Sequence, residues 1–441
     1  MKEVDSNRFV LAYGQGELAV SLPDHINITT IEKLAFQRVD ASEGDMVRHA
    51  LQSPVNAETL RQAAQGARSA CIVICDITRP VPNHLFLKPM VDELLAAGMS
   101  LNGITILVAT GLHRPNEGEE LRELIGDDWI VKNIRIRNHD ARNDDDHVFL
   151  GETPSRHTPV GIDRLLVDAD VRIVTGLVEP HFMAGYSGGR KVVAPGVAHH
   201  KTIRTFHAAR FMEHPSATSC VLEGNPLHEE QLEILKMLNR AQAPNRKVLA
   251  FNTVIDEQRR LVFANFGEAV ESHLAAVEVM RTSAEVRVGR KFHTVVTSSA
   301  GYPLDKTYYQ TVKGMVTPLD ILEPGGTLIV ASECSEGMGS EDYQAAQQRL
   351  IDDREGFLPS LLAKDLADID EWQTEQQVKS QTHANVQLFS NGLTDEDHLL
   401  TGVEKVDDVA KAILASIEAS GDPSIAVIPE GPYVVPFADS M

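Results

Sequence analysis

Short apolar runs alternate with helical patterns along most of the chain. Runs with the length of buried strands occur at 70–77, 103–111, 171–178 and 247–256. Helical periodicity is found at 84–99, with Gly98 near its end, and at 116–126. Because strands that alternate with helices form parallel sheets covered on both faces, the pattern predicts an α/β fold.

The same alternation restarts in the last third of the chain. After a helical pattern at 265–283, strands are expected at 292–300 and 325–334, with a helix at 306–323 between them. We therefore expect two α/β domains with mainly parallel sheets, residues 1–285 and 286–441, with the active site in the cleft between them. Residues 9–14 and 17–22 predict an N-terminal hairpin. A last strand is expected at 424–436, and its return to the first domain is left open.

Composition and charge restrict the classes of function. The 441 residues carry a formal net charge of −22, which argues against a general nucleic-acid-binding surface. There is no signal-peptide pattern at the start, and no apolar run approaches the roughly 20 residues of a membrane span, so we expect a cytoplasmic protein. Cys71 and Cys75 lie in one strand pattern, which disfavours zinc, and the four cysteines are expected to be reduced thiols.

Four loops that follow predicted strands carry unusual side chains. These are Asp76, Thr78 and Arg79 in "DITRP", His113 in "ATGLHRP", His181, Arg190 and Lys191 in "EPHFMAGYSGGRK", and Tyr309, Gln310 and Lys313 in "SSAGYPLDKTYYQTVKG". In open α/β sheets, ligands collect at the carboxyl ends of the strands. The joint placement of these loops therefore indicates a binding site.

Each side chain alone also has a structural explanation. Asp76 could cap a turn, Arg79 could pair with a surface carboxylate, and His113 could be an ordinary loop histidine. Tyr309 and Lys313 are spaced i, i+4, as on any helix face. If these side chains had unrelated structural roles, however, they would not be expected to gather at one edge of the sheet.

The glycines of "GYSGGRK" indicate close approach of the backbone to a ligand, with amides directed at an anion. The segment is not a Walker P-loop, because the spacing from Gly185 differs and Val192 follows the lysine. No GxGxxG motif of a dinucleotide fold accompanies it. The residues alone predict an anionic ligand, two histidines for proton transfer and a lysine of undefined role.

Taken together, the motifs resemble those of the lactate racemase family, the nickel-pincer nucleotide enzymes. The matching segments occur in family order and cover most of the chain: "DITRP", "ATGLHR", "NHD", "EPHFMAGYSGGRK", "TIRTFH", "GNPLHEE", "GYPLDKTYYQTVKGM" and "IPEGPYVVP". Their joint occurrence is specific, although "ATGLHR" alone would not be.

The resemblance implies a covalently bound cofactor in the first domain. This would be the nickel-pincer nucleotide, pyridinium-3,5-bisthiocarboxylic acid mononucleotide nickel, attached to Lys191 through a thioamide and supplied by separate biosynthesis proteins. His207 of "TIRTFH" would complete the nickel coordination, while His199 and His200 are interpreted as loop residues. The other implied cofactor contacts are Asp76, Thr78, Gly188, Gly189 and Arg190.

The resemblance also implies the reaction, inversion of C2 in a small 2-hydroxy acid. Removal of the hydroxyl proton while hydride leaves C2 gives a planar 2-keto acid, to which hydride can return on either face. His113 and His181 match the two bases of the family, and the ordinary imidazole pKa near 6.5 suits that role. The implied substrate contacts are Arg79, Tyr309, Gln310, Lys313 and Trp372.

The sequence leaves the substrate open between lactate and a larger 2-hydroxy acid. Lys306 and Tyr308 could supply added donors for a sugar acid, which a 2-epimerase of the same family would use, or they could be surface residues. A zinc-dependent hydrolase is a second reading, although no HExxH motif occurs. A non-enzymatic sensor of carboxylates or nucleotides is the third. The oligomeric state is not readable from the sequence.

Overall fold

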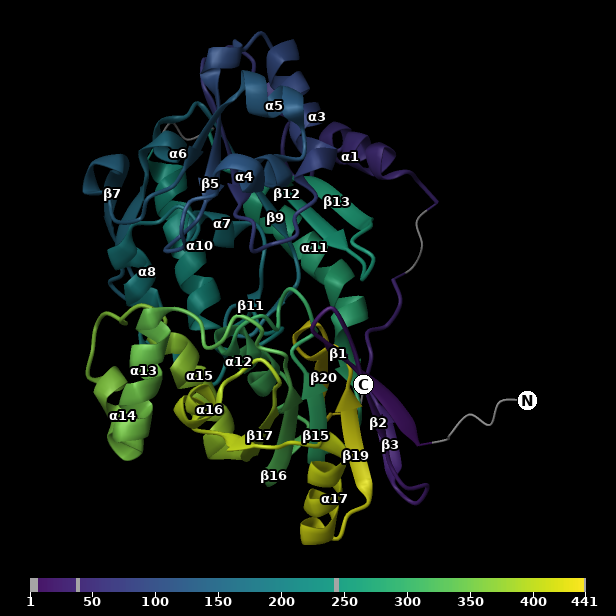
Figure 1. Ribbon diagram of the computed structural model, residues 1–441. Helices are drawn as coiled ribbons and strands as arrows, with labels where there is room; N and C mark the ends of the chain where they lie inside the picture. Colours follow the sequence, from purple (N-terminus) through teal and green to yellow (C-terminus); the bar gives the residue numbers. More distant parts are fainter. Residues whose placement is uncertain (1–6, 37–39, 242–245, 440–441) are drawn as a thin grey trace. The chain divides into compact units, whose positions relative to one another are not determined.

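The computed structural model describes residues 7–36, 40–241 and 246–439. The chain divides into two compact units (Figure 1). Unit 1 comprises Met1–Ala35, Ala208–Glu213 and Ser283–Met441, and unit 2 comprises Phe36–His207 and His214–Thr282. The start of the chain, which was expected in the first domain, thus groups with the C-terminal part.

Unit 2 is built mainly on one mixed sheet. Its strands are β4 (Ala70–Cys75), β5 (Ile104–Ala109), β6 (Arg135–Asn138), β7 (His147–Glu152), β8 (Pro159–Asp163), β9 (Val171–Leu177), β10 (Pro180–His181), β11 (Gly185–Tyr186), β12 (Leu249–Ile255) and β13 (Leu261–Glu268). Its helices are α1 (Glu43–Gln52), α2 (Leu60–Ala63), α3 (Asn83–Ala96), α4 (Gly118–Ile125), α5 (Asp128–Asn133), α6 (Arg164–Asp168), α7 (Arg190–Val193), α8 (His200–Phe206), α10 (Pro226–Arg240) and α11 (Ala269–Ala284).

The main sheet of unit 2 has the strand order β13-β12-β9-β4-β5-β6. All neighbouring strands are parallel except β12 and β13. Helices lie on both faces, as Figure 1 shows. Ile72 and Ile74, on one face of β4, pack in a core cluster with residues of α1, α2 and α3. The helices α6 and α7 also contact β4, but their residues lie outside that cluster.

Unit 1 contains the second α/β sheet. Its strands are β1 (Arg8–Tyr13), β2 (Gly16–Ser21), β3 (Asn27–Thr30), β14 (Glu285–Arg287), β15 (Phe292–Ser298), β16 (Leu322–Ala331), β17 (Asn385–Phe389), β18 (Glu404–Lys405), β19 (Ser424–Ile428) and β20 (Val435–Phe437). Its helices are α9 (Ala209–Met212), α12 (Tyr308–Val316), α13 (Glu341–Asp352), α14 (Arg354–Leu362), α15 (Glu371–His383), α16 (Asp395–Thr401) and α17 (Val409–Ser420).

The sheet of unit 1 is parallel throughout, with the order β18-β17-β16-β15-β19-β3. Successive residues of a strand point to opposite faces, and the two cores follow that period of two. Val295 belongs to the cluster that includes residues of α12, whereas Val296 belongs to the cluster that includes Ile413 of α17. Both faces of the sheet are therefore covered, as the near-continuous apolar strand patterns require.

The structure confirms the predicted fold class, two α/β regions with mainly parallel sheets. The predicted hairpin is formed by β1 and β2, which pair antiparallel. Several boundaries were wrong. Residues 265–268, expected to be helical, end β13. The helix expected at 306–323 ends at Val316, shortly before Pro318, and the strand expected at 325–334 is found at Leu322–Ala331.

The predicted last strand at 424–436 is two strands, β19 and β20, separated by a short 3-10 helix (Gly431–Tyr433). β19 pairs with β15 on one side and with β3 on the other, and β20 pairs with β14. The chain thus ends within unit 1, in which the first strands also lie.

The β4 core tests whether unit 2 depends on its sheet. Ile72 is fully buried, so Ile72→Ala is expected to lower the free energy of unfolding of unit 2 by about 2–5 kcal/mol. Leu274→Ala, at a residue that is 41% exposed, is the control and is expected to change it by less than about 1 kcal/mol. Urea unfolding, followed by hydrogen exchange of unit 2 peptides, measures the stability of both variants. Equal losses for Ile72→Ala and Leu274→Ala would contradict a core role for Ile72.

Candidate active site

The candidate site of unit 2 lies where the strand order of its sheet reverses. From β4 the chain proceeds to β5 and β6 on one side, and β9 and β12 lie on the other side. In doubly wound sheets, ligands bind at the carboxyl ends of the strands at such a switch point. The segments that follow β4, β5 and β9 carry Asp76, His113 and the glycine-rich loop (residues 185–191), respectively. The sheet therefore brings the predicted loops of unit 2 to one edge.

Asp76, directly after β4, binds the predicted base His113. Its Oδ2 lies 2.7 Å from Nδ1 of His113, and its Oδ1 accepts from the hydroxyl of Thr78 at 2.5 Å. Burial alone would raise the pKa of Asp76, but the hydrogen bonds from His113 and Thr78 hold that pKa below its usual value. The ionised carboxylate therefore accepts the Nδ1 proton, and the neutral ring carries its lone pair on Nε2.

His113 remains accessible within this arrangement. Its side chain is 60% exposed, whereas that of Asp76 is 7% exposed. A buried carboxylate thus orients an exposed imidazole, which is the arrangement that a general base requires. Thr78, predicted as a cofactor contact, supports this carboxylate in unit 2.

Arg79 forms an ion pair within unit 2. Its Nη1 donates to Oε1 of Glu179, which follows β9. The guanidinium is thereby held at the switch point between β4 and β9. Its predicted contact with a substrate carboxylate stays a prediction, and Glu179 was not identified from the sequence because a single glutamate before Pro180 gives no signal.

The glycine-rich loop rests directly on the backbone of β9. A Cβ at Gly176 would lie 2.8 Å from Cα of Gly188, and Gly188 itself has φ +85°. The hydroxyl of Ser187 donates to the carbonyl of Leu177 at 2.7 Å and accepts from the amide of Glu179 at 3.0 Å. Close packing therefore requires glycine at 176 in β9 and at 188 in the loop. This packing requirement is a second reason for the glycines, besides the predicted contact with a ligand.

Arg190 is directed into the loop. Its Nη2 donates to the carbonyl oxygens of Ala184 and Tyr186, both at 3.1 Å, and its Nη1 lies 2.9 Å from Nε2 of His273. Burial lowers its pKa to about 9, so it remains a cation at neutral pH. These contacts give Arg190 a structural role, and its predicted cofactor contact stays a prediction.

His273 of α11 is a loop anchor that the sequence did not reveal. Its Nε2 also lies 2.8 Å from the carbonyl oxygen of Ser187, and a Cβ at Gly189 would lie 3.1 Å from Cβ of His273. A lone histidine in an amphipathic helix pattern gives no sequence signal for this contact. The loop thus packs against β9 and against α11.

Lys191 and His181 lie together at the end of this loop. Nζ of Lys191 is 3.2 Å from Nε2 of His181. Nδ1 of His181 accepts from the backbone amides of Met183 at 3.3 Å and Ala184 at 3.1 Å. The antiparallel pair β10 and β11, in which His181 is opposite Gly185, forms this tight turn.

His207 directly follows α8. Its Nδ1 donates to the carbonyl of Ile203 at 2.8 Å, which places the ring's lone pair on Nε2. Burial lowers its pKa to about 4, so the ring is neutral at pH 7. A neutral, oriented imidazole is the form that binds a metal ion, and an Nδ1–H bond to a carbonyl is the usual support for such a ligand.

The predicted substrate contacts of unit 1 lie on two packed helices. Nε1 of Trp372 in α15 is 3.3 Å from the hydroxyl of Tyr309 in α12, and Nε2 of Gln373 donates to the carbonyl of Tyr309 at 2.7 Å. Gln310 and Lys313 also lie on α12 and are half-buried. Within the described part of the chain, the buried Oε1 of Gln310 has no hydrogen-bond partner, which is unusual for a buried polar atom.

Two residues considered for a larger substrate have other contacts. Tyr308 is fully buried, and its hydroxyl donates to Oε1 of Gln377 at 2.9 Å. Lys306 forms an ion pair with Glu336. The prediction that Tyr308 is either a pocket donor or a surface residue is therefore wrong, because its ring fills the core of unit 1.

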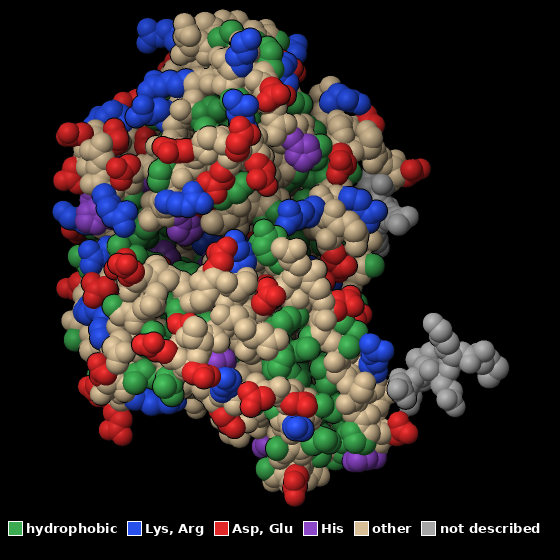
Figure 2. All heavy atoms as spheres, viewed as in Figure 1, with side chains coloured by type: hydrophobic (Ala, Val, Ile, Leu, Met, Phe, Trp, Pro, Cys, Tyr) green, Lys and Arg blue, Asp and Glu red, His purple; other side chains and the backbone are tan. Residues whose placement is uncertain are grey.

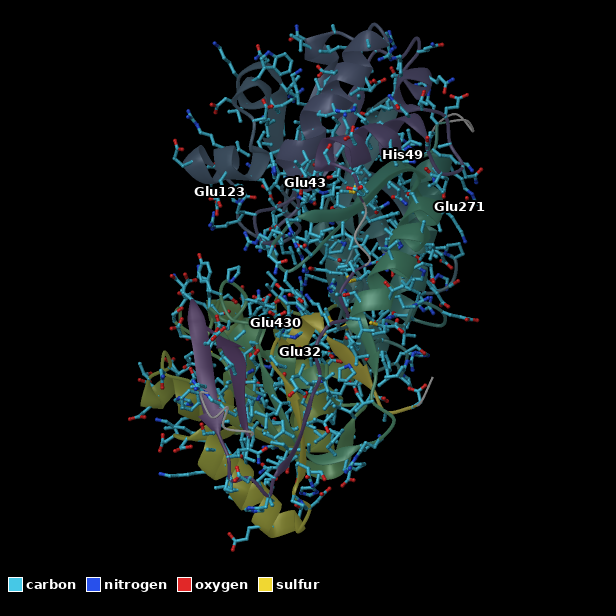
Figure 3. All side chains as sticks on the ribbon, turned by 90° about the vertical axis from the view of Figure 1, so that its right-hand side faces the viewer. Glu32, Glu43, His49, Glu123, Glu271 and Glu430 are labelled. Atoms are coloured by element: carbon cyan, nitrogen blue, oxygen red, sulfur yellow. The ribbon has the colours of Figure 1, made fainter. Side chains whose placement is uncertain are left out.

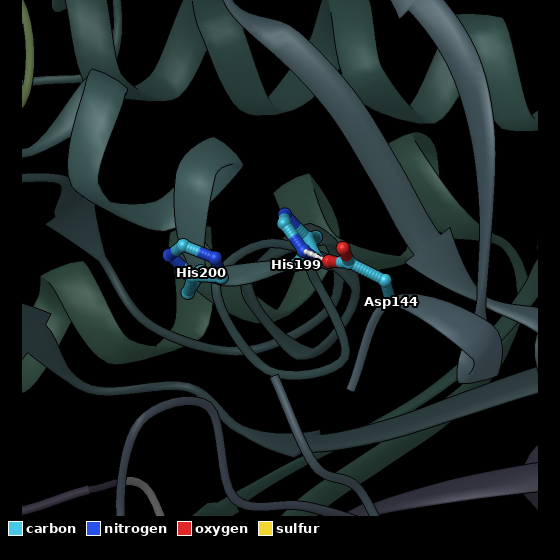
Figure 4. Close-up of side chains that lie close together, drawn as sticks. All are labelled: Asp144, His199 and His200. Atoms are coloured by element: carbon cyan, nitrogen blue, oxygen red, sulfur yellow. Dashed lines mark hydrogen bonds and ion pairs between the residues drawn. The ribbon is translucent and has the colours of Figure 1, made fainter. Parts of the chain in front are cut away.

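Asp144, His199 and His200 lie close together at the start of α8 (Figure 4). Among the described residues, they are the one group of three or more His, Cys, Asp or Glu side chains within reach of a common metal ion. Nε2 of His199 lies 2.7 Å from Oδ1 of Asp144, and its Nδ1 accepts from the amide of Lys201 at 3.3 Å. Since both nitrogens of His199 already have hydrogen-bond partners, one of them at the start of α8, the group favours a structural role over a zinc site.

The surface gives no sign of a basic binding face on the side that Figure 2 shows, where acidic and basic side chains are interspersed. Some acidic groups support the fold. Glu43 and Glu271, labelled in Figure 3, accept from the amide of Leu261 and from Nδ2 of Asn56, each at 2.8 Å. No helix in the described ranges is long and apolar enough to span a membrane.

Sequence comparison connects these observations to known proteins. The profile of the lactate racemase N-terminal domain matches residues 13–219, and that of the lactate racemase C-terminal domain matches residues 289–435. The chain is 32% identical over 431 residues to a lactate racemase of Thermoanaerobacterium thermosaccharolyticum, covering 96% of this chain and 98% of that protein. The chain belongs to the lactate racemase family. It is accordingly an enzyme of the isomerase class.

Further relatives agree with the family. A lactate racemase of Lactiplantibacillus plantarum is 31% identical over 402 residues, 89% of this chain and 91% of that protein. The solved structure of the lactate racemase apoprotein from T. thermosaccharolyticum superposes with a TM-score of 0.87 at 30% identity, covering 97% of this chain and 99% of that one. A Thermotoga maritima protein (TM-score 0.62, 18% identity, 87% of this chain and 98% of that one) shares the fold.

The contact between Gly176 and Gly188 can be tested by adding one methyl group. Gly176→Ala would place a Cβ 2.8 Å from Cα of Gly188, so we expect a loss of about 1–3 kcal/mol in the stability of unit 2. Gly44→Ala, where the nearest atom is 3.7 Å away in a flexible arginine, is the control and should be neutral or stabilising. Chemical denaturation measures both, and equal stability of the two variants would refute the close packing.

Proposed function

We propose that this protein is a 2-hydroxy-acid racemase that inverts C2 by proton-coupled hydride transfer, with lactate as the first candidate substrate. Both curated relatives described above are named lactate racemase. The observation that carries the proposal is the placement of Lys191 at the glycine-rich loop, 3.2 Å from His181. A lysine tether and a proton-transfer group at one point of the sheet are what the reaction requires.

The cofactor that we assign is the nickel-pincer nucleotide, covalently bound to Lys191 and made by separate proteins. When bound, it would supply nickel and an acceptor for the substrate hydride, while the residues of this chain would hold the group and move the proton. The donor set of unit 2 fits such a group. The Nε2 lone pair of His207 can complete the coordination of a metal whose other donors come from the cofactor, and nickel accepts imidazole readily.

The neutral state of His207 supports this assignment. Its pKa, lowered to about 4 by burial, keeps the proton off Nε2 across the physiological range. The described residues offer no other group of metal ligands apart from the one at the start of α8, in which both nitrogens of His199 are engaged. A zinc-dependent hydrolase therefore has little support.

His113 is suited to be the base that removes the substrate hydroxyl proton. The Asp76 carboxylate accepts from its Nδ1, so Nε2 can take a proton and the carboxylate stabilises the imidazolium that forms. His181 is assigned to the opposite face of the substrate. Its Nδ1 is engaged by two backbone amides, so the two histidines differ in the nitrogen that carries the proton.

We assign the remaining contacts to substrate binding. Arg79 and Lys313 provide cations for the carboxylate, and on unit 1 Nε1 of Trp372 donates to the hydroxyl of Tyr309. The buried Oε1 of Gln310, for which the described residues provide no partner, is suited to accept a hydrogen bond from the hydroxyl of a 2-hydroxy acid. Because Tyr308 is in the core and Lys306 is ion-paired, no observation favours a sugar acid over lactate.

The cofactor assignment predicts a mass increment on Lys191. Co-production with the cofactor's biosynthesis proteins should give a peptide containing modified Lys191, with nickel near one equivalent per chain. Lys191→Arg should abolish the increment, because arginine cannot form the thioamide. Lys201→Arg, at an exposed lysine on α8, is the matched control and should retain it. Intact mass, peptide mapping and nickel analysis measure this, followed by a racemisation screen of 2-hydroxy acids.

The outcomes separate the parts of the proposal. An unmodified Lys191 beside full racemase activity would contradict the covalent tether. A modified Lys191 with no turnover of lactate but with turnover of another 2-hydroxy acid would correct the substrate alone. Full modification without turnover of any 2-hydroxy acid would overturn the reaction.

The role of Asp76 gives a second prediction. Asp76→Asn removes the carboxylate that fixes the His113 tautomer, so kcat should fall by about 10²- to 10⁴-fold while the cofactor remains attached. Asp144→Asn alters another Asp–His pair, the one with His199, and should leave kcat within about twofold. Steady-state kinetics on the loaded enzyme measure both, and similar kcat values for the two variants would show that His113 does not act as the base.

A further inference from the structure

The hydrogen bonds of His181 determine which of its nitrogens carries the proton. Backbone amides can only donate, and two of them, from Met183 and Ala184, are directed at Nδ1. Nδ1 is therefore the unprotonated nitrogen, and the proton of the neutral ring is on Nε2. An Nδ1–H tautomer or an imidazolium would place an N–H against both amides, at the cost of both hydrogen bonds.

This tautomer has a consequence for Lys191. Nε2 of His181 lies 3.2 Å from Nζ of Lys191, a hydrogen-bond distance. A protonated lysine has three donors and no acceptor, so it could not pair with an Nε2–H group. The contact is satisfied when Nε2–H donates to the lone pair of an unprotonated amine.

Two groups near Lys191 in unit 2, Arg190 and His207, are compatible with a neutral amine. The guanidinium of Arg190, the next residue, is directed at the carbonyls of Ala184 and Tyr186. His207 is neutral, since burial lowers its pKa to about 4. The ordinary lysine pKa near 10.4 leaves about one molecule in 2,500 unprotonated at pH 7, so a group that holds the neutral form changes its reactivity greatly.

We propose that His181 has a role before any substrate binds: it holds Lys191 as an unprotonated amine and thereby prepares it for covalent attachment of the cofactor. This inference rests on the proposed function for the identity of the group attached. In this step His181 is a positioning residue, since it acts through the Lys191 amine. The role precedes, and is separate from, the proton transfer assigned to the same ring.

The attachment is a condensation that balances without an oxidant or a reductant. The amine of Lys191 forms a bond to the carbon of a thiocarboxylic acid, the C–O bond of that acid breaks, and the oxygen leaves as water. One thiol proton and two amine protons become one thioamide proton and the two protons of water. Only an amine with a lone pair on nitrogen can start this step.

Attachment then changes the surroundings of His181. The nitrogen of a thioamide is conjugated and is a poor hydrogen-bond acceptor, so the Nε2–H···Nζ hydrogen bond cannot persist. His181 loses this partner at the moment when the cofactor is in place. The same ring thus serves Lys191 in the apoprotein. For the proton transfer assigned to it in the loaded enzyme, Nδ1 must release the two amides so that Nε2 can accept a proton.

The inference can be tested in the full-length apoprotein with acetic anhydride as the probe. Acetylation of Lys191 is followed by peptide mass spectrometry between pH 7 and pH 11. With His181→Leu, the rate at pH 7 should fall by at least about tenfold, because the amine reverts towards the ordinary lysine pKa. Near pH 11 the two rates should converge, since an ordinary lysine is then largely unprotonated. Circular dichroism and urea unfolding of His181→Leu show whether the variant is folded.

Two further variants complete the design. His181→Gln retains an N–H donor near the position of Nε2 and should recover part of the rate. His49→Leu, at an exposed histidine on α1, removes an imidazole outside the site and should leave the rate at pH 7 within about twofold. An unchanged rate for His181→Leu, or equal losses for His181→Leu and His49→Leu, would overturn the inference.

The same variants separate this inference from the proposed cofactor. If His181→Leu acquires the nickel cofactor as rapidly as the wild type, by intact mass, the role of His181 in attachment is wrong and the cofactor assignment stands. If acetylation follows the predicted pattern but the wild type acquires no adduct, the cofactor assignment fails, and a reactive Lys191 prepared by His181 remains.

Discussion

The backbone contact between Gly176 and Gly188 is the constraint on which the candidate site of unit 2 depends. It seats the glycine-rich loop on β9 at the switch point of the sheet, where a Cβ at Gly176 would meet the loop at 2.8 Å. This contact thereby also positions the turn that holds His181 and the short helix that begins with Arg190. Backbone packing therefore fixes the position of Lys191, so its side chain is not needed to hold the loop and can take part in a reaction.

Most of the fold was readable from the sequence because buried parallel strands leave long apolar runs. The strands at 70–77 and 171–178 were found for this reason, and β9 lies beside β4 in the structure. The errors lie where one local pattern hid another. Residues 265–268 end a strand that runs directly into α11, so their apolar positions merge with the helical pattern. Nothing local shows that β3 pairs with β19, because that pairing joins the two ends of the chain.

The candidate site was readable as a set of residues, but the division of labour among them was not. His113, His139 and His199 each lie within 2.9 Å of a carboxylate, yet the rings of His139 and His199 are fully buried. What distinguishes His113 is its exposure beside a buried aspartate. Likewise, the tautomer of His181 depends on two amides of a tight turn, and a residue list cannot contain that information.

The pairing of β3 with β19 also determines the order in which the two units can fold during synthesis. Unit 2 has all its strands once residue 282 has emerged, whereas the sheet of unit 1 needs both the first residues and the last helix and strand. Until then, β3 lacks its partner strand β19, and closing so long a loop is slow. A fragment that starts at Ser283 would expose one edge of β19 as an open template for aggregation, so the C-terminal region cannot be treated as a separable module.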